Sequence, residues 1–170
     1  MANRHLKKAG IKAIPLEGDL VYVAFVENKD DAGNRYPKLR VGMEYLEDQY
    51  MLSLDIKSDV AQRLIVKLDN CQPGEYVRLS AWPTMVVKGN RTFINHALSM
   101  KNAEGKEVPA NTTFSAGVKQ QTEGVAATLR AAGIMDEKVI ATAKATKRVD
   151  AHKELLQAIE SRFIAAGASA

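Results

Sequence analysis

The sequence predicts a mainly β protein of the α+β class, in which five strands and one inserted helix are followed by a helical C-terminal part. Two observations lead to this prediction. Between residues 19 and 100, apolar residues mostly alternate with polar ones, in runs separated by turn-forming Gly, Pro, Asn and Asp. From about residue 122 the composition shifts to Ala, Lys, Glu and Leu, and the apolar residues recur in steps of three and four.

The first three strands follow from the alternation. Residues 19–27 are rich in Val and aromatic residues and lie between Gly18 and the polar loop "NKDDAGNRYP". The next runs, "KLRVGMEYL" and "YMLSLDI", alternate with period two around the short link "EDQ". We therefore expect one strand followed by a hairpin.

A helix is expected to interrupt the strands. In "SDVAQRLIVKLDN" the apolar residues fall at helical spacing, and Ser58 or Asp59 can serve as the N-cap. The turn "QPGE" then leads back to alternation over residues 75–82. We expect this strand to break at Pro83 and a second hairpin to follow, around Gly89-Asn90, because this pair suits a two-residue turn with positive φ.

The rest of the chain is predicted to be helical after an edge segment or loop at residues 108–117. A short helix should end at Gly133, and a longer one should begin near Asp136. The apolar stripe of the longer helix covers more turns than a small barrel can easily shelter. We therefore expect the C-terminal helices to mediate homo-oligomerisation; the alternative is a helix packed along its own barrel. The stripe consists of Val139, Ala143, Thr146, Val149, His152, Leu156, Ile159 and Phe163.

Five strands with a helix before the fourth match the oligonucleotide/oligosaccharide-binding barrel, the OB-fold. The predicted organisation is a basic N-terminal arm (residues 1–18), an OB-like nucleic-acid-binding barrel (residues 19–117) and a C-terminal helical extension (residues 118–170). A small α+β sandwich is the alternative architecture.

Composition and charge narrow the class of protein. With 170 residues, 46% of them hydrophobic and 26% charged, the chain suits one folded core. Its apolar runs are too short to span a bilayer, and a single cysteine, Cys71, fits a reducing compartment, so we expect a cytoplasmic protein without a membrane partner. Basic residues outnumber acidic ones mainly in residues 1–16 and 61–118, which favours an anionic partner.

Motifs for catalysis are not found in the sequence. Its three histidines, His5, His96 and His152, do not have metal-ligand spacing, and the chain has no phosphate-binding glycine motif and no nucleophile motif. We therefore expect a protein that is not an enzyme and that has no metal or other cofactor.

The only Trp of the chain lies beside a basic hairpin, where it points to single-stranded nucleic acid. If Val77 and Leu79 face the core, the alternate residues of the same strand point outward in a row. Bases stack on aromatic rings, and cations neutralise phosphates. The alternative is that the Trp plugs the end of the barrel and the cations only keep the turn soluble. The predicted binding residues are Trp82, Tyr76, Arg78, Lys88, Arg91 and Phe93, extended by Arg40, Lys38 and Tyr36.

The run "SDVAQRLIVKLDNCQPGEYVRLSAW", followed by a basic hairpin and "HALSMKNAEGKEVP", resembles the bacteriophage-type OB-fold single-stranded DNA-binding proteins. The resemblance covers residues 19–110. It implies a protein that coats single strands during DNA replication and recombination, in the host cytoplasm if a phage encodes it. Many members carry an acidic C-terminal tail, whereas this sequence finishes "FIAAGASA".

Three functional hypotheses follow. The first is a non-enzymatic, largely sequence-independent single-stranded DNA-binding protein. RNA binding is a close variant, because neither stacking nor phosphate contact distinguishes the sugar. The second, from a different class, is a protein-interaction or assembly module in which Trp82 and Phe93 anchor a partner. The third is an enzyme that needs no metal.

Overall fold

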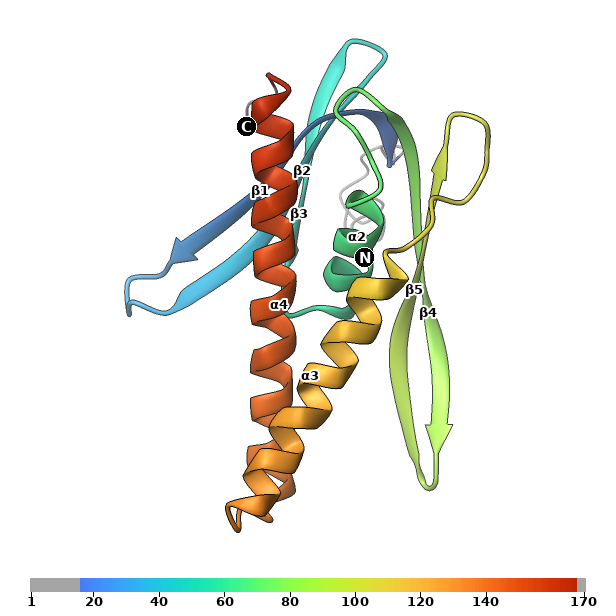
Figure 1. The fold of residues 1–170 in the computed structure, drawn as a ribbon. Helices are drawn as coiled ribbons and strands as arrows, with labels where there is room; N and C mark the ends of the chain where they lie inside the picture. The colour runs from blue at the N-terminus through green and yellow to red at the C-terminus, as the bar shows by residue number, and fades with distance from the viewer. Residues whose placement is uncertain (1–15, 168–170) are drawn as a thin grey trace.

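The computed structural model describes residues 16–167 as an α+β protein in which one antiparallel sheet carries three helices (Figure 1). This confirms the predicted α+β class, but helices and strands contribute about equally, so the protein is not mainly β as expected. The predicted basic arm lies outside the described residues up to residue 15, and residues 17 and 18 belong to the first strand. In chain order the elements are β1 (Glu17–Lys29), β2 (Arg35–Tyr45), β3 (Asp48–Asp55), α2 (Asp59–Leu68), β4 (Tyr76–Lys88), β5 (Arg91–Asn102), α3 (Thr112–Ala131) and α4 (Glu137–Ala165).

The sheet is open and does not close into a barrel, so of the predicted five-stranded OB-like barrel the structure shows the five antiparallel strands but not the barrel. Its strand order is β3-β2-β1-β4-β5, which leaves β3 and β5 as unpaired edges. The strand β1 pairs with β2 along most of its length, from Asp19 to Lys29, but with β4 only at Glu17, Gly18 and Asp19. The sheet therefore consists of two wings, β1–β2–β3 and β4–β5, joined over three residue pairs.

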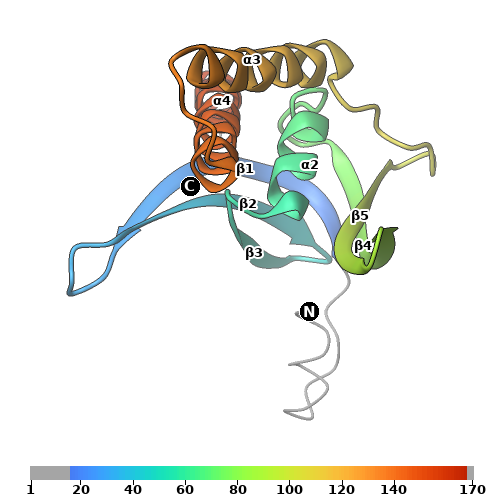
Figure 2. The ribbon, with the colours of Figure 1, turned by 90° about the horizontal axis from the view of Figure 1, so that it is seen from below.

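Helix α4 covers the edge of β1 where β4 has diverged. The backbone N–H of Phe25 donates a hydrogen bond to the Glu160 carboxylate at 3.2 Å, and the Lys153 ammonium lies 4.9 Å from the centre of the Phe25 ring. Seen from below, α4 and α2 lie on one side of the sheet and α3 lies across them (Figure 2). No helix within residues 16–167 is long and apolar enough to cross a membrane.

Local signals place most elements as expected. Ser58 caps α2 by accepting a hydrogen bond from the Ala61 N–H at 3.2 Å. The hairpin of β2 and β3 forms, although its turn residues are Leu46 and Glu47, both with positive φ. The predicted break at Pro83 is wrong, because β4 runs through it to Lys88. From Ser80 onward β4 has a strand neighbour on one side only, where a missing N–H is tolerated.

The C-terminal helices belong to the same fold as the sheet. Leu156, Ile159 and Phe163 of α4 are at most 1% exposed and lie in the main core. The first half of α4 packs on α3, where Ile140 and His152 are buried. Four of the eight residues of the predicted oligomerisation stripe are buried and two are half-buried, whereas Val139 and Thr146 are exposed. Self-association through this stripe therefore gains no support from the structure. The predicted edge segment or loop at residues 108–117 is right as far as Asn111 and wrong beyond it, because α3 begins at Thr112 and contains the proposed boundary at residue 118.

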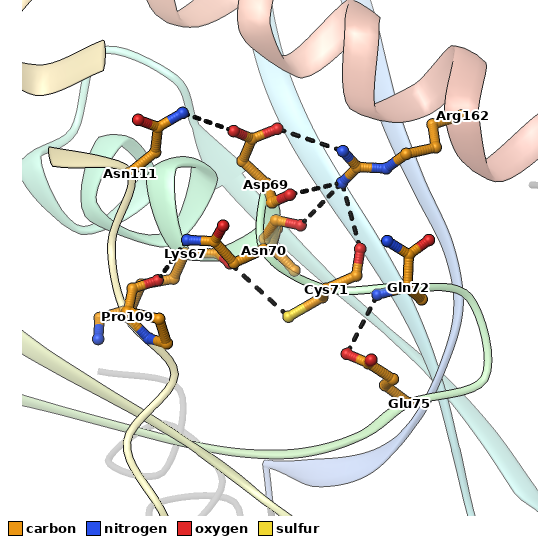
Figure 3. Close-up of polar contacts among 10 residues, drawn as sticks. Lys67, Asp69, Asn70, Cys71, Gln72, Glu75, Pro109, Asn111 and Arg162 are labelled. Atoms are coloured by element: carbon orange, nitrogen blue, oxygen red, sulfur yellow. Dashed lines mark hydrogen bonds and ion pairs between the residues drawn. The ribbon is translucent and has the colours of Figure 1, made fainter. Parts of the chain in front are cut away.

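A cluster of polar contacts locks α4 onto the end of α2 (Figure 3). The Arg162 guanidinium donates to the backbone carbonyls of Asp69 at 2.9 Å, Cys71 at 3.2 Å and Leu68 at 3.3 Å. It also lies 3.4 Å from the Asp69 carboxylate, which accepts a second hydrogen bond from Asn111 at 2.7 Å. Because the last carbonyls of a helix have no partners within it, Arg162 supplies the donors that α2 lacks.

Candidate nucleic-acid interface

The hairpin of β4 and β5 projects from the body of the protein (Figure 1). Its two strands pair without interruption from Val77↔Asn102 to Lys88↔Arg91, and the Gly89-Asn90 turn has the predicted positive φ at Gly89. Between residues 81 and 95 every residue is exposed except Thr84 and Val86, which are half-buried. This outer part of the hairpin therefore has no second layer packed on it.

Strand pairing assigns the side chains of the hairpin to two faces. One face, here called the aromatic face, carries both exposed aromatic rings of the hairpin and all its cations. The opposite face, the aliphatic face, carries no charged residue among residues 81–98. The aromatic face includes Arg78, Trp82, Thr84, Val86, Lys88, Arg91, Phe93, Asn95 and Lys101, and the aliphatic face Ala81, Pro83, Met85, Val87, Thr92, Ile94, His96 and Leu98.

The two rings of the aromatic face are accessible. Trp82 is 48% exposed and Phe93 is 45% exposed. Because Trp82 pairs with Ala97, Phe93 lies four residues further along the hairpin, or about 13 Å at the usual rise of a strand. The two rings are therefore far enough apart to receive different bases of a strand.

Cations lie at both ends of the aromatic face. Lys88 and Arg91 face each other across the turn, and Arg78 faces Lys101 at the base. Within residues 16–167 only Arg78 of these four lies within ion-pair distance of an acid, Glu17, at a long 3.9 Å, and Lys101 pairs with Glu107 across an isolated β-bridge. Like charges placed opposite each other repel, so a bound anion would relieve an unfavourable contact between Lys88 and Arg91 at the tip.

Tyr76 lies on the same face but is engaged within the protein. It is half-buried, and its hydroxyl donates a hydrogen bond to the Glu17 carboxylate. This bond, together with burial, raises the pKa of Tyr76 to about 12. Tyr76 therefore helps to hold the joint between β1 and β4, and its ring is less accessible than those of Trp82 and Phe93.

The predicted extension on β2 is separated from the hairpin. Tyr36, Lys38 and Arg40 point to the same side of the sheet, but they lie on the other wing, beyond the acidic pair Asp19↔Glu44. Tyr36 is exposed and donates from its hydroxyl to Asp30 at 2.8 Å. Lys38 and Arg40 are half-buried. The nine predicted residues thus do not form one continuous basic surface.

Two features of the hairpin were not predicted from the sequence. Lys101 joins Arg78 at its base, which the register of a hairpin around Gly89-Asn90 could have indicated. The exposed aliphatic residues Met85, Val87 and Ile94 were not foreseen, because alternating apolar residues normally indicate a core face.

Neither a reactive thiol nor a metal-binding cluster is present in the described part of the chain. Cys71 is buried, and desolvation raises the pKa of its thiol to about 12, so it is not a nucleophile at neutral pH. Within residues 16–167 no three His, Cys, Asp or Glu side chains come together as a metal site would require. The geometry of the hairpin is therefore the most distinctive feature from which a function can be argued.

Comparisons with protein-family models, with curated proteins and with solved structures gave no match to this sequence or its fold.

Proposed function

We propose that the protein binds single-stranded DNA through the aromatic face of the β4–β5 hairpin, without catalysis and with little sequence preference. The observation that carries the proposal is the pair of accessible rings, Trp82 and Phe93, set between cations at the tip and the base of one hairpin face. Each ring can stack on a base of any sequence, and the cations can neutralise the phosphates between them.

The arrangement of the elements supports the same proposal. Three strands, a helix and a two-stranded hairpin follow one another, and β1 pairs with both β2 and β4, as in an OB-fold without its closing strand pair. The resemblance to phage-type single-stranded DNA-binding proteins rests on the same segments. A role in DNA replication or recombination is part of the proposal.

The single Trp makes a direct test feasible. Because Trp82 is the only Trp, its fluorescence reports on the proposed site alone. We expect single-stranded DNA to quench this fluorescence and to bind more tightly than a duplex of equal length; a matched RNA strand shows whether the sugar matters. Equal and weak affinity for all three nucleic acids would refute the proposal, because it would leave only generic electrostatic attraction.

Two sets of variants locate the site. By analogy with other stacking residues, Phe93→Ala should weaken binding about 5- to 150-fold, corresponding to about 1–3 kcal/mol per stacked base. Ile164→Ala is the matched control, since Ile164 is 60% exposed on α4, away from the hairpin. Lys88→Gln and Arg91→Gln should each lower the slope of log affinity against log salt by about 0.7, whereas Lys138→Gln on α4 should leave it unchanged. Equal effects of the hairpin and control variants would contradict the placement of the site.

A protein-interaction module is the second candidate, favoured by the exposed aliphatic face. Salt distinguishes the two functions. Nucleic-acid binding weakens steeply as salt rises, because counterions are released on binding, whereas an apolar protein interface is nearly insensitive to salt.

A further inference from the structure

The aliphatic face of the β4–β5 hairpin is uncovered and uncharged. Met85 is 77% exposed, Val87 69% and Ile94 65%, and Met85 lies directly opposite Ile94 on the paired strands. A surface of this kind on a monomer is usually an interaction site. Because the face has no cation, a nucleic-acid backbone gains no ion pair on it.

A cleft continues this face toward the body of the protein. It has a volume of about 460 Å³ and lies between the unpaired edge strand β3, the start of α2 and the base of the hairpin. Leu52 and Leu54 line it from β3, and Val60 and Leu64 from α2. Its hairpin wall includes Ala81, Pro83, His96 and Leu98, which also belong to the aliphatic face.

We propose that this surface binds a second copy of the chain. On one face each copy carries an apolar projection, formed by Met85, Val87 and Ile94 near the tip, and a mainly apolar hollow, the cleft, whose lining also includes Asp59. A twofold axis between two antiparallel hairpins places each tip across the cleft of the other copy, so one patch meets itself. The aliphatic face has no charged residue among residues 81–98, so no like charges oppose this pairing. On the aromatic face every charged residue is a cation, so this face would repel a copy of itself.

The available area sets the expected strength. The exposed fractions of the aliphatic face correspond to roughly 500 Å² per copy and to about 1,000 Å² for the pair, at the lower limit for a specific interface. The dimer is therefore weak and forms at high protein concentration. In this dimer both aromatic faces point outward. If the proposed function is correct, the two copies can bind one nucleic acid strand together. The association of the two copies itself does not depend on the proposed function.

Sedimentation of the full chain without nucleic acid tests the proposal. The wild type should show a reversible monomer–dimer equilibrium. Combining Met85→Ser, Val87→Thr and Ile94→Thr should weaken it by more than about tenfold, with unchanged binding of a short oligonucleotide. The control combines Trp82→Ser and Phe93→Ser on the opposite face and should keep the dimer while losing oligonucleotide binding. A wild type that stays monomeric at the highest concentration overturns the dimer, whereas a dimer that binds no oligonucleotide overturns the proposed function instead.

Cross-linking identifies the face directly. Ile94→Cys and Asn95→Cys place thiols on adjacent exposed residues that point to opposite faces, and the buried Cys71 does not compete for the reagent. A bismaleimide should join two copies through position 94 and not through position 95. Equal cross-linking at both positions, or protection of position 94 by oligonucleotide at protein concentrations where only monomer is present, would assign the aliphatic face to something other than a second copy.

Discussion

Replacing Arg162 by Met is the sharpest test of how the helices hold the sheet. The side chain donates to three backbone carbonyls at the end of α2, at 2.9, 3.2 and 3.3 Å, and lies 3.4 Å from the Asp69 carboxylate. Met keeps the apolar stem of the side chain and removes only the donors. Any change in stability can therefore be attributed to the polar contacts.

The size of the effect follows from these contacts. A hydrogen bond to a charged group contributes about 1.5–3 kcal/mol net, and two of the four contacts are long. The Arg162 side chain is also 35% exposed, so water replaces part of what is lost. We expect Arg162→Met to lower the free energy of unfolding by about 2–4 kcal/mol, with Arg162→Lys in between because an ammonium lacks the fork of donors.

Urea unfolding followed by far-ultraviolet circular dichroism measures this difference, because the helices dominate that signal. Arg130→Met is the control: Arg130 pairs with Glu137 on the surface, and such a pair contributes at most about 1 kcal/mol. If Arg162→Met unfolds within about 0.5 kcal/mol of the wild type, the contacts in Figure 3 do not hold α4 to α2, and the reasoning is wrong.

Three further predictions concern the joint, the hairpin base and the helices. Gly18→Ala should lower the free energy of unfolding by more than about 2 kcal/mol in urea melts, because a Cβ at this φ of 152° would lie 2.4 Å from the backbone oxygen of Glu44; Gly124→Ala in open space on α3 should instead be neutral or stabilising. Burial would raise the pKa of Glu107, but hydrogen bonds from Lys67, Ser99 and the Met100 N–H lower it to about 2. The contribution of Glu107 to the free energy of unfolding is therefore present above its unfolded pKa near 4.5 and is lost as the pH falls toward 2. Glu107→Gln should make the free energy of unfolding, measured in urea, depend less on pH across that range. A chain truncated after residue 117 should be unfolded by circular dichroism, because it lacks the α4 residues of the core; a folded, cooperatively melting fragment would show that the sheet is stable alone.

The elements that sequence analysis predicted well have signals within a few residues. The Ser58 cap precedes a run with helical spacing, and Gly89-Asn90 lies between two alternating runs. Asn111 is also a local signal, since its side chain accepts from the Phe114 N–H at 2.9 Å and caps α3, but the neighbouring Pro109 and two threonines favoured a loop. The alternation of apolar and polar residues along β4 likewise placed Trp82 on the exposed face of the strand.

Features that depend on distant segments were not predictable. Closing the barrel would require β3 and β5 to pair, and nothing within either strand shows whether they meet. Periodicity identified the apolar stripe of α4, but it cannot show that the sheet and α2 cover Ile159 and Phe163. Met85 and Ile94 likewise share an alternating strand face with other apolar residues, as core residues do. Only the structure shows that they lie on the part of the hairpin that extends beyond the core.

The base and the tip of the β4–β5 hairpin differ in what holds them, and this difference connects the fold to the proposed site. At the base, Leu79 and Met100 lie in the core, and Glu107 ties β5 to α2 by accepting from the Met100 N–H at 2.9 Å and from Lys67 at 2.6 Å. Beyond Trp82 only the pairing of the two strands remains, and an isolated hairpin is marginally stable in water. The hairpin therefore depends on the stability of the body. The core residues of α4 and the Arg162 contacts contribute to that stability. A ligand on the aromatic face, or a second copy on the aliphatic face, would add the missing layer, so binding and ordering of the tip should be coupled.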